Sequence, residues 1–521
     1  MINIDEAFIL DFYLKEIETD NIIFLKGKDK NKEKIKTLVT SLKTAESMNE
    51  KISITKDLWK ALFEASMSFI DPDKDGYDKL FKYFDNYVEF EELIFASDSF
   101  YRDHTLHSLW VYFLGDYILK EPSFKDLTSR IYTFINYSRS ILSQLKSFSK
   151  PELFEPLIKL FEDLISSEKY NESIFCVSAL THDLGYPLKK IDKINNSIGK
   201  ILPSFAIGNY EKFNFDFSVV DQNYIHDFLK ILSTDFNMMF DNNDTIYDTL
   251  ENNEILEKAV ILNPNIGISG FDTDYFSTLS EDKLFMIKRY LSPKIVPIHF
   301  PSTYARNCSD FENYKHGIMS AFLLCKNIRA FSNIRNIFET APVNTDTLNN
   351  INLVNFPSTQ TKLNILKAVS DHTSDYYKII GIDNWSSILT FVDELEEFSR
   401  ISRANQNREY IAEFCTTNIY MEDSWINIDF TFSNTSIDNL SPEKAFKGRC
   451  VRFLSLFDIP NLRDTLKIRL RCIGKLPKDK NIYTLEIAHK YASIKINDEA
   501  MDIPSYLQSN NFYTTEEYMN L

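Results

Sequence analysis

Residues that can bind a metal lie in five separate segments of this sequence. The segments are RDHTLHSLWVY, SALTHDLGYP, NYKHGIMSAFLL, KAVSDHTSDYY and SILTFVDELEEFSR, and they contain His104, His107, His182, Asp183, His316, His372 and Asp393. The chain has only 8 histidines, so their concentration in these segments is informative. Neutral imidazoles and carboxylates suit Mn, Fe, Ni, Co or Zn, with Mg a further candidate. The sequence therefore predicts a site for divalent metal ions.

The dipeptide His182-Asp183 at the end of an apolar helical pattern gives this site a possible chemistry. Both side chains can reach one centre, and an aspartate has two oxygens that can bridge two ions. Two bridged metals a few ångströms apart can activate a water and hold the oxygens of an in-line displacement at phosphorus. We therefore expect Asp183 to be catalytically essential.

The order His…HisAsp…His…His…Asp resembles the HD-domain superfamily of metal-dependent phosphohydrolases. The resemblance covers roughly residues 95–402 and is most specific in HSLWV, HDLG, HGIMSA and LTFVDEL. It implies two metal ions, the first held by His107, His182, Asp183 and Asp393 and the second by Asp183, His316 and His372. It also implies a phosphohydrolase or phosphodiesterase whose small anionic substrate is a nucleotide. The alternative for these histidines is a structural role in the core, and for Asp393 an exposed helix face.

Neighbouring residues are candidates for acid–base work and phosphate binding. His104 lies three residues before His107 and could protonate a leaving alkoxide, although phosphodiesterases of this superfamily use a spacing of four. Arg400 follows Asp393 by seven residues, two turns along a helix, and could touch a substrate phosphate or form an ordinary salt bridge. Further phosphate-binding candidates are Lys189, Lys190 and Arg306.

Two acids and three other histidines receive subordinate roles. Asp103 and Asp375 could orient ligand histidines through the second ring nitrogen. The pair His226-Asp227 lacks a following glycine and lies in an irregular stretch, so we expect a packing or surface role. His299 and His489 are isolated and are expected to be structural.

Two other function classes compete with hydrolysis. Diiron oxygenases of the same superfamily often carry a lysine three positions after the HD aspartate, where this chain has Tyr186. A regulatory metal domain whose tail binds a protein or ligand is the other alternative. In that tail Lys467, Arg469 and Arg471 alternate along a predicted strand, and with Arg449 and Arg452 they could contact an anion or could form a solvated sheet face.

Helical patterns dominate the elements that must position these residues. Val111, Leu114 and Ile118 recur at helical spacing, and the helix ending in the HD pair stops at Gly185 and Pro187. Helical periodicity returns at 312–336, 361–372 and 385–402. The less regular segment at about 200–300 is expected to be an insertion that covers the site and selects the substrate.

The last part of the chain has a different pattern. Strict alternation in WINIDFTFS and LKIRLRCIG, with IYTLEI and YASIKI after them, predicts strands, and Ser441-Pro442-Glu443 predicts a helix start. We therefore expect a mainly α protein with three parts. These are N-terminal helices at 1–95, an HD-type helical bundle at 96–404 with the insertion, and a C-terminal α+β module at 405–521.

Composition narrows the function classes further. Glycine makes up only 12 of the 521 residues, and neither GxGxxG nor GxxxxGK[ST] occurs, which disfavours dinucleotide-binding and P-loop enzymes. The net charge of -17 argues against binding to nucleic-acid polymers. Six dispersed cysteines, no signal-peptide pattern and no long apolar run predict a cytoplasmic protein that does not enter a membrane.

Overall fold

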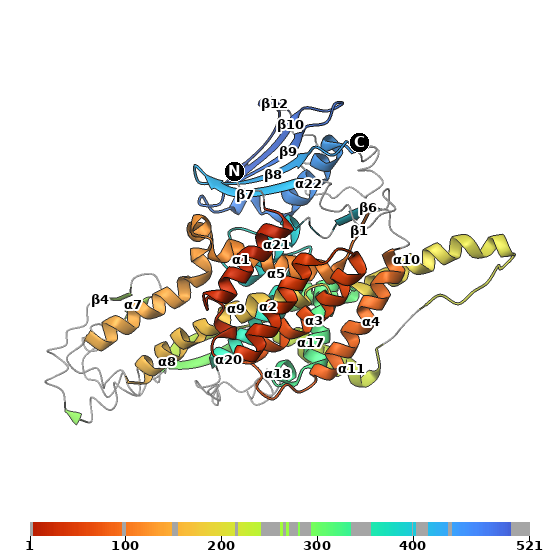
Figure 1. Cartoon of the computed structure of the whole chain (residues 1–521). Helices are drawn as coiled ribbons and strands as arrows, with labels where there is room; N and C mark the ends of the chain where they lie inside the picture. Colours follow the sequence, from red (N-terminus) through yellow and green to blue (C-terminus); the bar gives the residue numbers. More distant parts are fainter. Residues whose placement is uncertain are drawn as a thin grey trace.

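The computed structural model describes residues 4–95, 100–147, 155–213, 217–240, 261–263, 267–269, 280–281, 293–334, 356–396, 398, 400–402, 415–435 and 440–501. Helices make up most of this part of the chain, and a six-stranded sheet lies near its C-terminal end (Figure 1). The predicted fold class, mainly α with a smaller C-terminal α+β module, is confirmed.

Four helices form the N-terminal part: α1 (Glu6–Glu18), α2 (Asp29–Thr44), α3 (Met48–Met67) and α4 (Tyr77–Phe95). Side-chain oxygens of Asp5 and Ser47 accept backbone N–H groups at the starts of α1 and α3. Trp59 of α3 stacks on Phe84 of α4, and its indole N–H donates to the carbonyl of Leu180 at 2.7 Å. These helices therefore pack directly on the helix that precedes the HD pair.

The central helices carry the predicted metal ligands. They are α5 (His104–Lys120), α9 (Asn171–Thr181), α17 (His316–Asn327), α20 (Phe356–Asp371) and α21 (Trp385–Leu395). Every residue of α5 from His104 to Ile118 is buried, and α9 is buried from Ser173 to Thr181. Helices that are buried all round lie in the interior of a protein. Helix α9 packs against α3, α5, α20 and α21, so the core surrounds it.

The other elements of the helical part surround this core. They are α6 (Lys125–Thr128), α7 (Thr133–Ser147), α8 (Glu155–Ser166), α10 (Tyr186–Ile201), α11 (Val219–Leu232), α16 (Pro301–Glu312), α18 (Arg329–Ser332) and the paired strands β2 (Thr234–Phe240) with β5 (Pro293–His299) and β3 (Ile261–Asn263) with β4 (Gly267–Ser269). The pair α7 and α8 projects from one side of the body and α10 from the other (Figure 1). Most of the predicted insertion between 240 and 293 lies outside the described residues.

The helical pattern predicted for 385–402 ends earlier in the structure. Helix α21 stops at Leu395, and Glu396 has extended backbone angles, φ -70° and ψ 119°. The chain then forms the short strand β6 (Arg400–Ser402), which pairs antiparallel with β1 (Phe100–Arg102). The prediction that Arg400 continues the helix face of Asp393 is therefore wrong, because α21 ends at Leu395 and Arg400 lies in strand β6.

The C-terminal sheet has the strand order β12-β11-β10-β9-β8-β7. Its strands are β7 (Thr416–Glu422), β8 (Trp425–Phe432), β9 (Ile468–Gly474), β10 (Ile482–Ala488), β11 (Tyr491–Ile496) and β12 (Glu499–Met501). Helix α22 (Pro442–Leu456) connects β8 to the parallel strand β9, with Ser441 accepting the N–H of Lys444 at its start. The predicted helix start and the predicted strands are confirmed.

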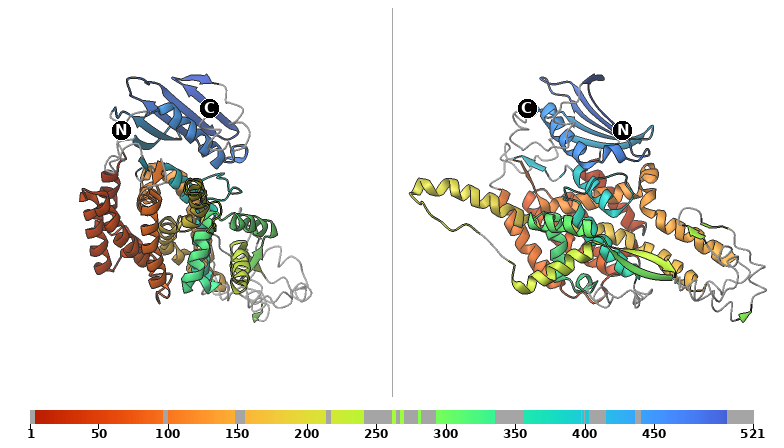
Figure 2. Two further views of the ribbon diagram at one scale, coloured as in Figure 1. Left: turned by 90° about the vertical axis from the view of Figure 1, so that its right-hand side faces the viewer. Right: turned by 180° about the vertical axis from the view of Figure 1, so that it is seen from behind.

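This module lies at one end of the helical part (Figure 2), where it contacts the segment between α20 and α21. The N–H of Ile379 donates to the carbonyl of Leu456 at 2.9 Å, and the N–H of Asp458 donates to the carbonyl of Ile379 at 3.0 Å. Arg463 forms an ion pair with Asp383 at 2.6 Å. The segment held in this way leads from one predicted metal-ligand helix to the next. Among the helices described, none has the length and apolar character needed to cross a membrane.

Candidate metal centre

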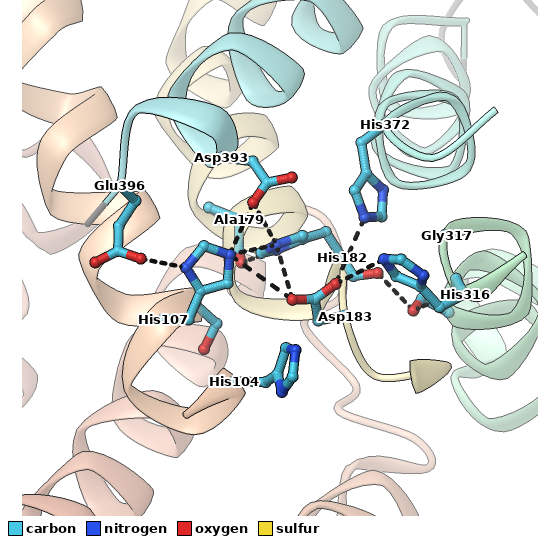
Figure 3. A network of polar contacts seen from close by, with 12 residues as sticks. His104, His107, Ala179, His182, Asp183, His316, Gly317, His372, Asp393 and Glu396 are labelled. Atoms are coloured by element: carbon cyan, nitrogen blue, oxygen red, sulfur yellow. Dashed lines mark hydrogen bonds and ion pairs between the residues drawn. The ribbon is translucent and has the colours of Figure 1, made fainter. Parts of the chain in front are cut away.

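The six predicted metal ligands meet in one network of polar side chains (Figure 3). They come from α5, the α9–α10 turn, the start of α17, the end of α20 and α21, and they are His107, His182, Asp183, His316, His372 and Asp393. The two carboxylates lie between the imidazole rings. Four of the six residues are less than a tenth exposed, namely His107, His182, Asp183 and His372. Distant segments of the sequence therefore converge as the ligand pattern predicts.

His107 is held between two carboxylates. Its Nε2 lies 2.8 Å from Oδ1 of Asp393, and its Nδ1 lies 2.6 Å from Oε2 of Glu396. Both His107 and Glu396 are fully buried. Glu396, which directly follows α21, was not predicted from the sequence. The sequence signal for this residue was its position three residues after Asp393. The predicted continuation of the helix through this position gave no reason to assign Glu396 a separate role.

His182 presents a nitrogen lone pair to the centre. Its Nδ1 donates to the carbonyl of Ala179 at 2.7 Å, which fixes the ring and directs Nε2 inward. Burial lowers the pKa of His182 to about 4, so the imidazole is neutral near pH 7. Its Nε2 lies 3.4 Å from Nε2 of His107 and 3.4 Å from Oδ2 of Asp183. An inward lone pair beside a carboxylate oxygen is an arrangement that a cation stabilises.

Asp183 lies between two groups of imidazoles, one on each side. Oδ2 is 3.4 Å from His182 and 3.7 Å from His107, whereas Oδ1 is 3.1 Å from Nε2 of His316 and 3.6 Å from Nε2 of His372. Burial raises the pKa of this carboxyl, but the neighbouring histidines outweigh burial and hold the pKa well below its usual range. Asp183 is therefore ionised, with one oxygen available to each group.

His316 and His372 form the second group. Nδ1 of His372 donates to the carbonyl of Val369 at 2.7 Å, while its buried Nε2 has no hydrogen-bond partner within the described part of the chain. Nδ1 of His316 is likewise buried and unpartnered there. Burial lowers the pKa of His316 to about 4. Buried polar atoms without partners are costly, and a metal ion bound at Nε2 of His372 would satisfy that atom.

Two glycines let these helices approach closely. A Cβ on Gly185 would lie 2.3 Å from the carbonyl oxygen of His316, and one on Gly317 would lie 2.6 Å from the carbonyl oxygen of Val369. The N–H of Gly185 donates to Oγ of Ser320 at 2.7 Å, and that hydroxyl bonds the carbonyl of His182 at 2.6 Å. This contact fixes the HD turn against α17.

The described residues contain two groups that could hold a metal ion. Their ligand atoms lie within 4.8 Å of one another, and the groups are His107, His182 and Asp393, and His182, Asp183 and His372. The first group matches three of the four ligands that the resemblance implies for one metal. In the second group His182 takes the place predicted for His316, although His316 contacts the same carboxylate. The donor atoms are imidazole nitrogens and carboxylate oxygens, a set that fits first-row divalent metals.

His104, the predicted acid–base residue, is the first residue of α5. Its Nδ1 lies 2.7 Å from Oε2 of the buried Glu91, and its ring centroid lies 3.9 Å from that of Tyr186. The ring of Tyr186 is also 5.3 Å from the ring of His316. The close-up places His104 on the side of the network nearest Asp183 (Figure 3). Tyr186, which was singled out only as a departure from the oxygenase pattern, thus bridges His104 and a ligand histidine.

The two acids predicted to orient ligand histidines bind other groups. Asp103 accepts the N–H groups of Thr105 and Leu106 at 3.0 and 3.1 Å and caps α5. Asp375 is exposed and pairs with Lys315 at 2.7 Å. The Nδ1 atoms of His107, His182 and His372 are instead bound by Glu396 and by backbone carbonyls.

The predicted phosphate-binding residues divide into two groups. Lys189 and Lys190 are the fourth and fifth residues of α10, and Nζ of Lys190 is 4.6 Å from the ring centroid of Tyr186. Arg306 lies on α16 in a different place, beside a cavity of about 210 Å³ that Asp371 and Tyr376 also line. Arg400 lies on β6 opposite Arg102, and its side chain is outside the described part of the structure.

The remaining histidines lie apart from the network. His226 of α11 bonds the hydroxyl of Tyr304 at 2.7 Å, His299 ends strand β5, and His489 bonds the carbonyl of Leu462. The pair His226-Asp227 and the two isolated histidines therefore have local packing and hydrogen-bonding contacts.

Comparison with known proteins identifies no family for this chain. No family model, curated protein or solved structure matches it. The HD-domain resemblance therefore rests on the ordered ligand residues alone, and the functional argument must come from the geometry of the site.

Proposed function

We propose that this chain is a metal-dependent phosphohydrolase of the HD type that acts on a phosphomonoester or phosphodiester, with a nucleotide as the substrate class. Two divalent metal ions would be held by the six-residue network. When bound, they would supply Lewis acidity to a water nucleophile and to the phosphate oxygens.

The position of Asp183 is the observation that carries this proposal. Each of its two oxygens faces a different pair of histidines, at distances of 3.1–3.7 Å. A carboxylate placed in this way can bridge two ions, whereas a single-metal site needs only one side of it. The two ligand sets implied by the resemblance both include Asp183, and ions held on its two sides could act together in an in-line displacement.

The protein's own groups would fix the geometry of the centre. Glu396 and the carbonyl groups of Ala179 and Val369 hold the three Nδ1 atoms, so the Nε2 atoms of His107, His182 and His372 are directed inward. Ligand rings oriented by such hydrogen bonds lose little freedom when a metal binds. Burial also excludes bulk water from competing for these positions.

His104 is the candidate proton donor to the leaving oxygen. Glu91 binds its Nδ1, so Nε2 is the atom through which a proton would pass. The contact with Glu91 also fixes the orientation of the imidazole. Tyr186 packs on the ring and limits its orientation.

Metal analysis followed by a substrate panel tests the proposed function. The purified full chain is assayed with Mn²⁺ or Fe²⁺ against phosphomonoesters, phosphodiesters and nucleotides, beside an Asp183→Ala variant. We expect turnover that Asp183→Ala abolishes, because both metal sets lose their shared ligand. Asp375→Ala, which removes an exposed carboxylate near the site, is the matched control and should retain turnover. Surviving turnover in Asp183→Ala would overturn the site assignment.

The same purified protein distinguishes the two alternatives. Oxygen uptake together with an EPR signal from a mixed-valent diiron centre would indicate that the protein is an oxygenase and not a hydrolase. Bound metal without turnover of any compound in the panel would favour a regulatory metal domain. In that case the C-terminal module would be expected to bind the partner.

A further inference from the structure

Three of the helices that lead to the candidate metal centre, α5, α9 and α21, also line a cavity of about 190 Å³ near their other ends. The ligand candidates His107, His182 and Asp393 are at least about 12 Å away along these helices, at a rise of about 1.5 Å per residue. The cavity is therefore separate from the metal centre. Its lining includes Asp116 and Lys120 of α5, Asn171 and Glu172 of α9, and Trp385 of α21.

The charged side chains from α5 and α9 bind one another in this cavity. Nζ of Lys120 lies 2.9 Å from Oδ1 of Asp116 and 3.2 Å from Oε1 of Glu172. The other carboxylate oxygen of Glu172, Oε2, accepts the backbone N–H of Ile23 at 2.5 Å. Burial raises the pKa of both carboxyl groups, whereas Lys120 lowers it. Two carboxyl groups therefore share the single ammonium group of Lys120.

The lining also offers a buried acceptor and a buried donor that form no hydrogen bond within the described part of the chain. The acceptor is Oδ2 of Asp116 and the donor is Nδ2 of Asn171. Asp116 as a whole is only 4% exposed, so bulk water does not solvate its carboxylate. Buried polar atoms without partners are costly. A ligand that presents a donor to Asp116 and an acceptor to Asn171 would satisfy both atoms.

Aromatic side chains line the same cavity. The rings of Tyr132 and Trp385 have centroids 6.3 Å apart and planes at 84° to each other, and the buried Phe175 lines the cavity as well. Aromatic faces and edges favour contact with a flat ring of a ligand. Pockets for drug-sized molecules have volumes of about 300–1,000 Å³, and this cavity is smaller. The ligand is therefore limited to a small, planar ring system.

We propose that this cavity binds a small amino-substituted heteroaromatic base such as adenine, whose amino group donates to Oδ2 of Asp116 and whose ring nitrogen accepts from Nδ2 of Asn171. A base of this class carries a donor and an acceptor side by side on one edge. A phosphorylated form is disfavoured, because its phosphate would face the carboxylates of Asp116 and Glu172. The inference goes beyond the proposed hydrolase function and does not depend on it, since the cavity and the metal centre share no residue.

Adenine is the probe for this cavity, and purine, which lacks the amino group, is the matched control ligand. Calorimetry measures the binding of each to the chelator-treated full chain, for the natural sequence and for Asn171→Ala. We expect Asn171→Ala to weaken adenine binding about tenfold, the effect of losing one hydrogen bond. Purine should bind the natural sequence about tenfold more weakly than adenine for the same reason. Asn461→Ala removes an exposed amide that bonds Asp458 in the C-terminal module, and this variant should bind adenine normally.

The outcomes separate this inference from the proposed function. The proposal is overturned if adenine does not bind, if Asn171→Ala binds it as tightly as the natural sequence does, or if purine and adenine bind equally. Adenine binding that Asn171→Ala weakens, in a protein that hydrolyses no ester, would support the cavity and contradict the hydrolase. Asp116→Asn tests the acceptor and should also weaken adenine binding. Because this substitution disturbs the ion pair with Lys120, a melting temperature for each variant shows whether the protein remains folded.

Discussion

At the scale of single residues, the centre depends as much on the groups that orient its ligands as on the ligands themselves. His107 contacts Asp393 through one nitrogen and Glu396 through the other, while His182 and His372 donate to carbonyl groups of their own helices. Each ring therefore presents Nε2 to the centre before any metal binds. This common orientation requires local backbone geometry that residue spacing alone does not specify.

Replacing Glu396 by glutamine should weaken metal binding. The amide can still contact the ring of His107 but cannot stabilise positive charge on it, so we expect about 10–100-fold weaker affinity. Metal titration of the chelator-treated protein measures this change. Glu422→Gln, at an exposed end of β7, should bind metal as the natural sequence does. Equal affinities in Glu396→Gln and Glu422→Gln would contradict the role assigned to Glu396.

Replacing His104 by glutamine should affect turnover and spare the metal. Because His104 is assigned to proton transfer, we expect a fall of about 10²–10⁴-fold in kcat with an unchanged metal content. The fall should be smaller for an ester whose leaving group is a weak base, since that group needs no proton. An equal loss with good and poor leaving groups would assign His104 a structural role instead.

Much of the candidate centre could be predicted from residue types and their order. The six ligand positions converge, but Glu396 was missed and Asp103 was given a role it does not have. Asp103 precedes His104 and looks like a ligand partner in the sequence, yet the free N–H groups at the start of α5 bind it more directly. Local backbone groups compete with distant side chains, and only the folded chain decides between them.

At the scale of elements, close approach of helices α17, α20 and the HD turn brings the second group of ligands to Asp183. A side chain at Gly185 would meet the backbone of α17, which cannot move without moving His316. The same holds at Gly317, where a Cβ would lie 2.8 Å from Nδ1 of His372. The sparse glycines of this chain thus include two at contacts that set ligand distances.

Gly185→Ala should damage the second metal group selectively. The added methyl forces α17 away by overpacking, at a cost of about 1–3 kcal/mol in the free energy of unfolding. We expect metal stoichiometry to fall while the group of His107, His182 and Asp393 still binds an ion. Gly208→Ala, where a Cβ meets nothing within 4 Å, is the control. Unchanged stoichiometry in Gly185→Ala would refute this role of the glycine.

The limits of sequence-based prediction are clearest where α21 ends. Apolar spacing continues past Leu395, so periodicity predicted a helix through Arg400. The buried contact between Glu396 and His107 and the pairing of β6 with β1 override that local preference. The strands of the C-terminal module were predicted well, because the sequence alternation along β9 matches a burial that alternates residue by residue.

At the scale of the whole molecule, acid should destabilise the metal-free protein. Burial lowers the pKa of His182 and His316 to about 4 in the folded chain, whereas an unfolded histidine has a pKa of about 6.5. Between these values the unfolded chain binds more protons, so the free energy of unfolding falls as the pH is lowered from about 6.5 to about 4. Asp183, with its depressed pKa, adds a loss at still lower pH.

Urea unfolding of the chelator-treated protein at several pH values measures this effect. The midpoint should decrease on acidification, and a His182→Gln variant should show a shallower decrease because one of the buried histidines is gone. A midpoint independent of pH in this range would contradict the assignment of neutral buried imidazoles.

The pairing of β1 with β6 has a consequence for how such a protein can evolve. Strand β1 lies just before the first ligand helix, which starts at His104, and β6 follows the last one, and Phe100 of β1 is the register partner of Ser402 of β6. The two ends of the segment that carries all six ligand candidates therefore lie side by side. A segment whose ends meet can be inserted into, or exchanged between, larger chains with little rearrangement. Recombination could thus vary the flanking helices and the terminal sheet while the ligand arrangement is inherited intact.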